Sequence, residues 1–396
     1  MDSLAKRTFR LDLMRAPFHG FVQEGLVNLA LIIAIRHFDG SQLTKSVMAA
    51  AIPLGLLLNP LTLSWGARSG KSIGTLALGW LTLGAIATAI AALVPSLELF
   101  TLCIVVAGFT HAQLSPLAIQ VYTHNYDKSE RGKRLSGSSL AAAAGAGVLT
   151  YISGKILDFQ LDYYPWVLAA LVASFLMAGY VFKKIPVRQF DVKDTGNPWV
   201  NLKWSWHDKV FGLMLFAWMF MGIGNLMTLP LRTEYLANPE YGINLPNATI
   251  AILIVGVPSV FRFLSIPVWG WVFDKFNLIV VRIAINVFFF ISILGFFYTD
   301  SLVWITIASA ANGIATGGGN ITWALWVTKL APPERVSAYM SVHSSFTGIR
   351  GVLSPFLGFY LISAATPKDA GMVGALLVLI ASFMFATLLK HPRFRD

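Results

Sequence analysis

Charged residues are scarce in this sequence: only 12% of its 396 residues are Asp, Glu, Lys or Arg. A soluble domain has about 25% charged residues, because polar side chains must cover its surface. Cysteine is almost absent too, since Cys103 is the single one, and this excludes a disulfide framework. Apolar residues make up 56% of the chain, and its mean hydropathy is +0.66. This balance excludes a soluble enzyme, a disordered chain and a disulfide-stapled module, and it indicates a protein that spans a membrane many times.

Twelve apolar runs are long enough to cross a bilayer. A helix needs about 20 mostly apolar residues to cross a hydrocarbon core of about 30 Å. The runs cover residues 16–37, 43–65, 72–94, 97–123, 135–157, 164–184, 209–231, 247–269, 277–298, 301–328, 337–363 and 370–389. The basic start of the chain resembles a signal peptide, but the run after it is full length and has no small-residue cleavage site. We therefore predict an all-α integral membrane protein with twelve transmembrane helices, the first of them retained.

The positive charges are distributed unequally between the two sides of these runs. Most of the 30 Lys and Arg residues lie at the two termini and in the loops after even-numbered runs, and Arg282 is counted with the loop before the run 277–298. Cytoplasmic loops are enriched in Lys and Arg, so both termini are predicted to be cytoplasmic. The same bias explains the net charge of +11 without a nucleic-acid partner. The polar stretch 185–208 is predicted to be a cytoplasmic linker between an N-terminal bundle, 1–184, and a C-terminal bundle, 209–396.

An internal repeat relates the two halves of the sequence at a constant offset of 204 residues. The offset places Trp65-Gly66 on Trp269-Gly270, Lys71 on Lys275, Glu130-Arg131 on Glu334-Arg335, Gly147-Val148-Leu149 on Gly351-Val352-Leu353, and Gly154 on Gly358. One such match is expected by chance, but a series of matches at one offset indicates a duplicated bundle. Six plus six helices with a parallel repeat are typical of transporters.

Two loop motifs carry a resemblance to a known family. The segment GWVFDKFN at 270–277 resembles the Gly-x-x-x-Asp-Arg/Lys-x-Gly loop motif of the major facilitator superfamily, and GARSGK at 66–71 resembles its degenerate first-half copy. The resemblance covers essentially the whole chain and implies the major facilitator fold, with two six-helix pseudo-repeat bundles and alternating access. It also implies a gating motif of Gly270, Asp274 and Lys275, which locks the cytoplasmic ends of the bundles in the outward-facing state.

Three charged residues near the middle of the runs have no counterpart in the other half. Arg262 falls opposite Leu58, Arg350 opposite Ala146, and Glu24 opposite Thr228. A bare charge at the centre of a membrane helix costs at least about 2.5–3.5 kcal/mol, so we expect these side chains to face a wet cavity or a partner. An arginine pairs bidentately with a carboxylate or a phosphate. Two arginines on different helices therefore predict a small organic anion as the solute.

Further polar residues lie in the same runs. The predicted substrate-binding residues are Arg262, Arg350, Asn320, Asn28, Asn225 and Trp323, and the predicted proton carriers are Glu24, His111 and His343. His and Glu side chains are suited to proton coupling because protonation changes their charge. Each assignment has an alternative: a lock between bundles for Arg262, a structural pair for Arg350 and Glu24, and helix packing for the histidines, the asparagines and the tryptophan.

The sequence therefore predicts a secondary active transporter for a small organic anion of the carboxylate type, working by alternating access and coupled to protons. The alternative is a proton-coupled efflux antiporter for lipophilic or cationic compounds, because some members of the superfamily carry an acid in the first helix, as Glu24 is here. The run 135–157 lacks the Gly-Pro pair of the antiporter signature, and two central arginines repel a cation. No catalytic constellation is recognisable, so neither an enzyme nor a cofactor or metal is predicted. The expected partners are the solute, protons and the lipid bilayer, for a functional monomer in a bacterial inner membrane.

Overall fold

The structure is a computed structural model that describes residues 3–187, 201–332 and 335–394. Within these ranges the regular secondary structure is helical, and no strand occurs. Most of the predicted linker 185–208 lies outside the described residues, and so does Glu334 of the repeat. The described chain forms two compact units: unit 1 comprises Met1–Thr195 and Leu245–Val255, and unit 2 comprises Gly196–Asn244 and Gly256–Asp396. The bundle limits at residues 184 and 209 stay a prediction.

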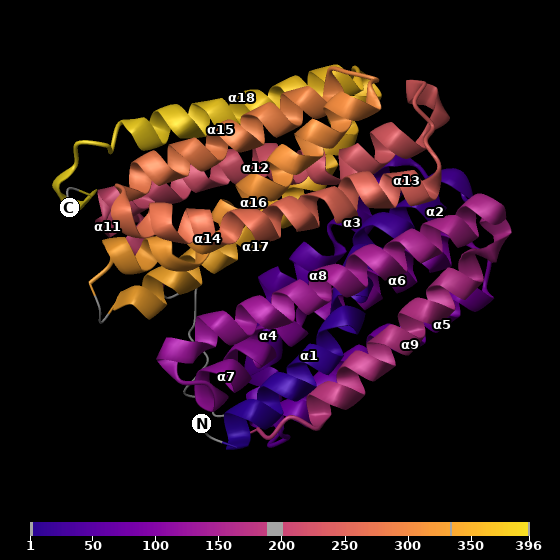
Figure 1. Cartoon of the computed structure of the whole chain (residues 1–396), viewed down its shortest axis with the longest axis horizontal. Coiled ribbons are helices and arrows are strands. Elements are labelled where there is room, and N and C mark those ends of the chain that lie inside the picture. The colour runs from indigo at the N-terminus through magenta and orange to yellow at the C-terminus, as the bar shows by residue number, and fades with distance from the viewer. Residues whose placement is uncertain (1–2, 188–200, 333–334, 395–396) are drawn as a thin grey trace. The chain divides into compact units, whose positions relative to one another are not determined.

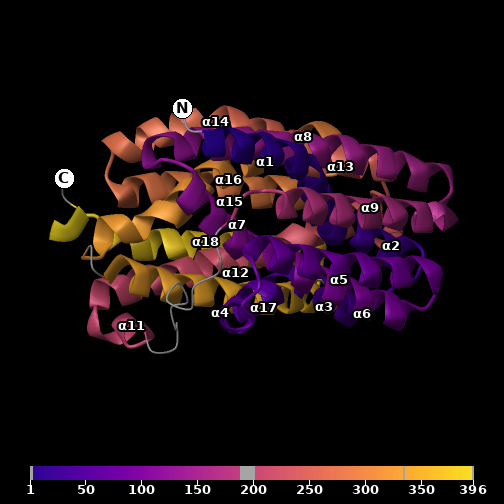
Figure 2. The same ribbon diagram turned by 90° about the horizontal axis from the view of Figure 1, so that it is seen from below.

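Unit 1 is built from long helices that pack side by side. Its elements are α1 (Ser3–Glu24), the π-helix η1 (Gly25–Leu29), α2 (Ala30–Arg36), α3 (Gln42–Ala49), α4 (Ala51–Arg68), α5 (Ile73–Leu93), α6 (Leu97–Ala112), α7 (Leu114–Asn125), α8 (Lys128–Phe159), η2 (Leu161–Tyr163), α9 (Tyr164–Lys183), α13 (Asn247–Ala251) and the π-helix η5 (Ile252–Gly256). Helix α5 packs against both α6 and α9, and α1 packs against α8 and α9 (Figures 1 and 2). The short helix α13 packs on α8.

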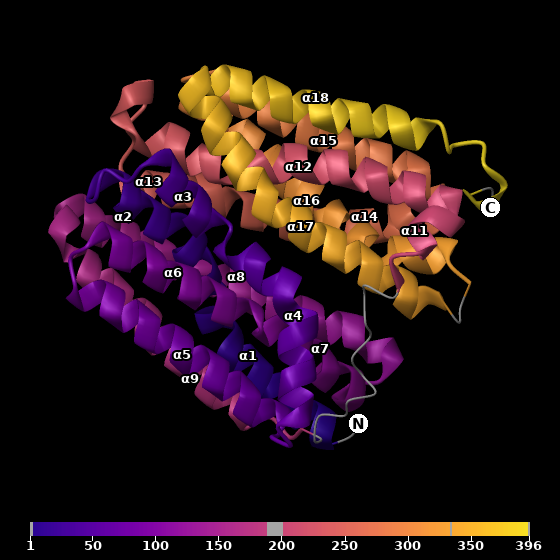
Figure 3. The same ribbon diagram turned by 180° about the vertical axis from the view of Figure 1, so that it is seen from behind.

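Unit 2 has the same kind of architecture. Its elements are α11 (Trp204–His207), α12 (Lys209–Ala237), η4 (Pro239–Tyr241), α14 (Val257–Lys275), α15 (Leu278–Phe297), α16 (Leu302–Leu330), α17 (Val336–Ala364), α18 (Pro367–Ala386) and η7 (Pro392–Phe394). Helices α12, α15 and α18 lie side by side (Figures 1 and 3). Helix α14 packs along α16, and α17 packs along α12.

The described helices agree with a multispanning membrane protein. Ten of them are long and apolar enough to cross a membrane, and the pair α3–α4, bent by 43°, is an eleventh if it forms one span. Helix α16 covers the remaining predicted run, 301–328, so the helices are consistent with twelve spans. The all-helical prediction is confirmed.

The first helix begins earlier than the sequence predicted, at Ser3 rather than near residue 16. The charged start of this helix is accommodated because Lys6, Arg7 and Arg10 are exposed, whereas Asp12 and Arg15 form an ion pair inside unit 1. Arg15 donates to Asp12 Oδ1 at 2.7 Å, and the hydroxyl of Tyr122 donates to the same oxygen at 2.7 Å. Asp12 and Arg15 are charged and yet buried. A hydropathy profile scores such residues as polar, so it does not show that the helix includes this segment.

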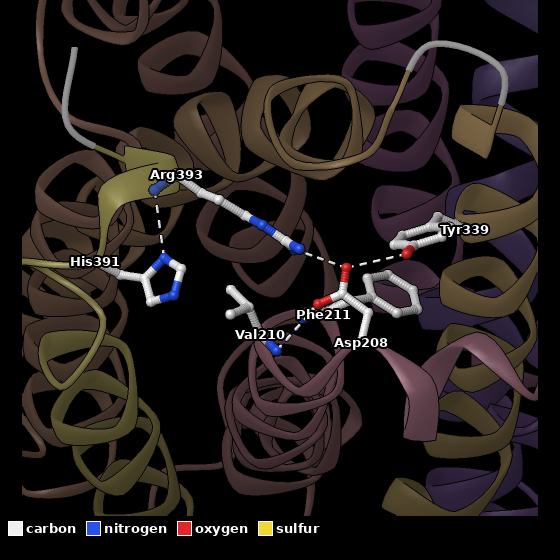
Figure 4. A network of polar contacts seen from close by, with 6 residues as sticks. All are labelled: Asp208, Val210, Phe211, Tyr339, His391 and Arg393. Atoms are coloured by element: carbon white, nitrogen blue, oxygen red, sulfur yellow. Dashed lines mark hydrogen bonds and ion pairs between the residues drawn. The ribbon is translucent and has the colours of Figure 1, made fainter.

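The start of α12 is fixed by a carboxylate (Figure 4). Asp208 Oδ1 accepts from the backbone N–H groups of Val210 and Phe211, both at 3.1 Å, and so caps the helix. Its Oδ2 accepts from the Tyr339 hydroxyl at 3.0 Å and from Arg393 Nη1 at 2.7 Å. Burial alone raises the pKa of Asp208, but Arg393 and these hydrogen bonds outweigh it and hold the pKa below the ordinary value. This carboxylate thereby links α12, α17 and the carboxyl-terminal turn within unit 2.

Candidate functional site

The predicted site residues divide between the two units. Unit 1 contains Glu24, Asn28 and His111. Unit 2 contains Asn225 on α12, Arg262, Gly270, Asp274 and Lys275 on α14, Asn320 and Trp323 on α16, and His343 and Arg350 on α17. Within unit 2 the structure brings Trp323, His343 and Arg350 together.

Arg350 lies in the interior of unit 2 and is only 4% exposed. Its Nη1 donates to the backbone oxygen of Trp218 at 2.5 Å, and its Nη2 donates to the Thr347 hydroxyl at 3.1 Å. The side chain lies where Gly222 of α12 leaves space, because a Cβ added there would come within 2.3 Å of Arg350 Cδ. Arg350 is therefore a buried cation that the absence of a side chain at Gly222 accommodates.

A second buried arginine belongs to this cluster, and sequence reasoning missed it. Arg282 was grouped with a cytoplasmic loop, but it lies inside α15 and is 1% exposed. Its guanidinium carbon lies 4.1 Å from the centroid of the Trp218 ring, and that of Arg350 lies 5.7 Å from the same centroid. Asn286 and Thr322 accept hydrogen bonds from Arg282. The repeat offers a signal that finds it, because the offset of 204 places Arg282 opposite the apolar Leu78.

His343 lies beside the two arginines inside a group of three tryptophans. The centroid of its ring is 5.3 Å from Trp218, 5.3 Å from Trp323 and 5.2 Å from Trp326. The indole N–H of Trp323 donates to the Thr347 hydroxyl at 3.3 Å, so Thr347 also connects this group to Arg350. We call Trp218, Arg282, Trp323, Trp326, His343, Thr347 and Arg350 the arginine–tryptophan cluster.

Many buried polar atoms of this cluster are unpaired. Among the described residues, no partner is found for Trp218 Nε1, Trp326 Nε1, Arg282 Nε, Arg350 Nε or either ring nitrogen of His343. No carboxylate of the described chain forms an ion pair with Arg282 or Arg350 either. The indole and guanidinium nitrogens are donors only. The cluster therefore presents an excess of donors and positive charge that suits an anion.

The buried arginines of unit 1 have carboxylate partners: Arg134 pairs with Glu130 and Arg15 pairs with Asp12. Arg15 is paired with Asp12 and Tyr122, as described above. The offset of 204 places Tyr122 opposite Trp326, so a hydroxyl in unit 1 corresponds to an indole N–H in unit 2. The charge of Arg15 is thus compensated by a carboxylate, whereas Arg282 and Arg350 have no carboxylate partner in the described part of unit 2.

Three other predicted substrate contacts of unit 2 lie outside this cluster. Arg262 is half-buried on α14, next to Gly317 of α16, and its side chain has no hydrogen-bond partner among the described residues. Asn320 is exposed on α16, one helical turn before Trp323. Asn225 is half-buried on α12, and its Oδ1 has no partner in the described chain. Their contact with a substrate stays a prediction.

In unit 1, Glu24 and Asn28 lie at a break in the first helix. Asn28 Nδ2 donates to Glu24 Oε2 at 2.8 Å, and the π-helical turn Gly25–Leu29 separates α1 from α2 at this point. Such π-helical turns occur frequently at functional sites. The four-residue spacing seen in the sequence therefore does correspond to a direct contact.

His111 is buried in unit 1 against a second histidine. Its ring stacks on His19 of α1 with centroids 4.6 Å apart and an interplanar angle of 25°. Nδ1 of both rings lacks a partner among the described residues. His19 was not singled out in the sequence, because its spacing to His111 is unrelated to any helical period.

The gating motif ends α14 at the surface of unit 2. Asp274 and Lys275 are exposed, and Lys275 Nζ lies 5.1 Å from the centroid of the Trp271 ring. Asp274 makes no hydrogen bond or ion pair within the described residues, so it is open to contact from another segment. Its role as a lock stays a prediction.

The family and the fold are shown by comparison with known proteins. The family model of the Major Facilitator Superfamily matches residues 18–260 and 240–396. The nucleoside transporter NupG has a TM-score of 0.77 at 13% identity, with 98% of this chain and 100% of that chain covered. A D-xylose–proton symporter has a TM-score of 0.70 at 11% identity, covering 97% of each chain. The human organic anion transporter MFSD10 (TETRAN) has a TM-score of 0.62 at 14% identity, with 97% of this chain and 100% of that chain covered.

At these identities the likeness to solved structures shows the fold alone. No curated protein matches the sequence significantly. The family model, however, covers most of the chain, including the loop motif at 270–277 and the buried arginines of unit 2. The chain therefore belongs to the Major Facilitator Superfamily, a family of multi-pass membrane transporters rather than enzymes.

Proposed function

We propose that this protein is a secondary active transporter that moves a small organic anion of the carboxylate type by alternating access, coupled to protons, as a monomer in a bacterial inner membrane. The major facilitator fold supports transport by alternating access. One observation supports a negatively charged substrate. Arg282 and Arg350 are both buried beside the indole of Trp218, and neither has a carboxylate partner among the described residues.

The energetic reason for an anion is the burial of two like charges. An arginine stays protonated in proteins, so burial cannot neutralise it. Contact with Trp218 offsets part of the cost of desolvation through the negative face of the ring, about 2 kcal/mol at a desolvated site. A carboxylate from the substrate would offset more, because hydrogen bonds to charged groups contribute about 1.5–3 kcal/mol each. A cationic substrate would instead add a third like charge, and this counts against the efflux alternative.

The contacts of Arg350 indicate how the anion is held. Nη1 and Nη2 each use one N–H group, for Trp218 and for Thr347, and Nε has no partner among the described residues, so Nε and the second N–H of each Nη remain as donors. Trp323 and Thr347 are half-buried, whereas Arg350 and Arg282 are buried, so the substrate approaches Arg350 past Thr347. Arg262, Asn320, Asn225 and Asn28 are retained as proposed substrate contacts of this carrier.

Proton coupling is proposed through His343, with Glu24 and His111 as the candidates of unit 1. The His343 ring shares Trp218 with both arginines, so a proton on the ring adds positive charge beside the bound anion. Anion binding therefore favours protonation of His343, and deprotonation favours release. This reciprocal preference is what symport of an anion with a proton requires.

The first experiment measures uptake of labelled mono- and dicarboxylates into proteoliposomes, with and without a pH gradient. We expect saturable uptake that an inward proton gradient increases. Arg350→Lys and Arg282→Lys keep the charge but lose the planar fork, so each should weaken the apparent affinity about tenfold or more, as expected for loss of a charge-assisted hydrogen bond of about 1.5–3 kcal/mol. Lys209→Gln, an exposed cation at the start of α12, is the control and should transport normally.

Two results would contradict the proposal. If no anion of a broad panel is transported, small organic anions are excluded as the substrate class. Resistance of a sensitive host to cationic drugs that survives Arg350→Ala supports the efflux antiporter instead. For the proton, His343→Gln should abolish stimulation by the pH gradient while anion exchange at equal pH persists, and unchanged stimulation would exclude His343 as the carrier.

A further inference from the structure

A groove lies in unit 1 at the turn that joins α4 to α5. Its volume is about 240 Å³, and its lining residues come from the end of α4, the turn and the first three turns of α5. These are Trp65, Lys71, Thr75, Leu76, Gly79, Trp80 and Leu83. The proposed transport function uses none of them, although Lys71 belongs to the loop segment GARSGK.

Two tryptophans and a glycine shape this groove. The rings of Trp65 and Trp80 have centroids 6.1 Å apart and are inclined by 62°, and Trp65 is 60% exposed. A Cβ added to Gly79 would meet no atom within 4 Å, so the space over this residue is open. The groove is thus an apolar slot whose open side faces away from the core of unit 1.

The apolar surface continues beyond the groove along one face of α5. Leu83, Ile86, Ile90 and Leu93 are all exposed, and their spacing of three and four residues puts them on the same face as Gly79. From Gly79 to Leu93 this face is about 21 Å long at 1.5 Å rise per residue. One leaflet of a hydrocarbon core about 30 Å thick is shorter than this. The face is therefore long enough to support an extended acyl chain.

The opposite end of the groove is positively charged. Lys71 lines it, and Arg68 precedes it at the end of α4; both are exposed and have no side-chain partner among the described residues. The end of α9 lies beside the start of α5, because a Cβ on Gly74 would come within 3.2 Å of Lys183 Cα, and Lys183 is also exposed. No acidic residue lines the groove. Its rim thus carries uncompensated positive charge on the side predicted to be cytoplasmic.

We propose that this groove binds one anionic phospholipid of the cytoplasmic leaflet. The phosphate lies against Lys71, with Arg68 and Lys183 nearby, and an acyl chain passes between Trp65 and Trp80 over Gly79 toward Leu83. Tryptophan is suited to the boundary between headgroups and hydrocarbon. Basic pockets between transmembrane helices on the cytoplasmic side bind acidic headgroups. A charged rim joined directly to an apolar slot matches the two ends of such a lipid better than it matches a soluble anion or a protein surface.

The test compares lipids of equal acyl chains on the full-length protein in phosphatidylcholine nanodiscs. Thermal unfolding is measured as phosphatidylglycerol replaces phosphatidylcholine, and native mass spectrometry counts the phosphatidylglycerol retained. We expect the midpoint to rise by a few degrees with one tightly retained lipid. Gly79→Leu fills the open slot, and Lys71→Gln removes the central charge. In each variant the rise in the midpoint should be at most half of the wild-type rise, and the tightly retained lipid should be lost.

Matched controls separate binding from general effects. Gly147→Leu also adds a side chain where a Cβ meets nothing within 4 Å, and Lys155→Gln removes another exposed lysine of unit 1, so both should keep the full shift. Equal shifts in all variants, no rise in the midpoint when phosphatidylglycerol replaces phosphatidylcholine, or an equal rise with inorganic phosphate alone would overturn the proposal. If Gly79→Leu does not fold, Lys71→Gln and the lipid selectivity decide. Thermal unfolding and lipid retention do not depend on transport, so this test is independent of the proposed substrate.

Discussion

Arg350 and Arg262 show how differently two arginines with similar sequence contexts are placed. Both interrupt apolar runs, and both lack a counterpart under the repeat. Arg350 packs into the space at Gly222, whereas Arg262 is half-buried beside Gly317. The repeat identifies a charge that the shared scaffold does not need. It cannot show where that side chain points, because the rotation of a helix about its axis depends on its neighbours.

The close approach of Arg350 to Gly222 gives a prediction for a single methyl group. In Gly222→Ala the new Cβ would lie 2.3 Å from Arg350 Cδ and 2.4 Å from Nε, so the side chain must move away from Trp218. If Arg350 binds the substrate, affinity in the proteoliposome assay should fall about tenfold, the roughly 1.5 kcal/mol of one charge-assisted hydrogen bond.

Gly147→Ala is the matched control for this experiment, because a Cβ there meets no atom within 4 Å. It should leave affinity and thermal stability unchanged. Wild-type affinity in Gly222→Ala would show that the position of Arg350 does not matter to the substrate.

At the scale of helices, the junctions between elements carry features that periodicity does not reveal. The first span contains the π-helix η1, and the span 247–275 contains the π-helix η5, whose residues up to Val255 belong to unit 1. At the start of this span, Asp158 Oδ1 accepts from Asn247 N at 2.5 Å and its Oδ2 accepts from Ala248 N at 3.1 Å. Arg36 Nη2 donates to the backbone oxygen of Leu245 at 2.7 Å. A negative charge at a helix N-terminus is favourable, so the two contacts of Asp158 hold α13 on α8, while Arg36 connects the preceding segment to α2.

Asp158→Asn tests this attachment. The variant loses the charge and one of two acceptors, so α13 should open more often, by about 1 kcal/mol or roughly fivefold. Hydrogen exchange of the Asn247 and Ala248 amides should accelerate to that extent. Asp162→Asn, an exposed acid on the neighbouring turn, is the control; equal exchange in both variants would contradict the attachment.

The capping carboxylate of α12 gives a prediction about pH. The pKa of Asp208 is below its ordinary value, so its contribution to stability is complete above the unfolded pKa of about 3.9 and is lost as the pH falls through the lower native pKa. In detergent at pH 7, Asp208→Asn should cost about 1 kcal/mol, the upper range for a partly exposed ion pair.

The measurement is the difference in unfolding temperature between wild type and Asp208→Asn as a function of pH. This difference should be constant between pH 7 and pH 5 and should shrink as the pH is lowered below about 4. A difference that persists unchanged at the lowest pH would exclude the charge of Asp208 as its cause.

At the scale of the whole molecule, two units of related sequence differ in how they compensate buried charge. Arg15 in unit 1 is bonded to Asp12 and Tyr122, while Arg282 and Arg350 in unit 2 have no carboxylate partner among the described residues. Duplication conserves the scaffold, so a difference of this kind marks where the halves have separate tasks. The asymmetric half is where we propose that the anion binds.

The exposed Asp274 at the end of α14 offers a prediction about the whole transport cycle. If it locks the cytoplasmic ends of the bundles, as the family motif implies, Asp274→Asn should shift the conformational balance and slow uptake. Substrate affinity, measured as a ligand-induced thermal shift, should persist, because the residue is not part of the arginine–tryptophan cluster. Asp127→Asn, another exposed acid on the side predicted to be cytoplasmic, should transport normally, and normal transport by Asp274→Asn would exclude the lock.

The sequence by itself determined that this is a helical membrane protein, where most of its spans lie, and that its loops resemble those of a transporter family. These properties depend on local composition and spacing, which the bilayer constrains strongly. Only the tertiary structure decided that Arg282 joins Arg350 around Trp218 and that His343 lies among three tryptophans. It also decided that Tyr122 joins the Asp12–Arg15 pair. Such contacts join residues far apart in the chain or depend on which way a helix face is turned, and only the packing of one helix on another fixes both.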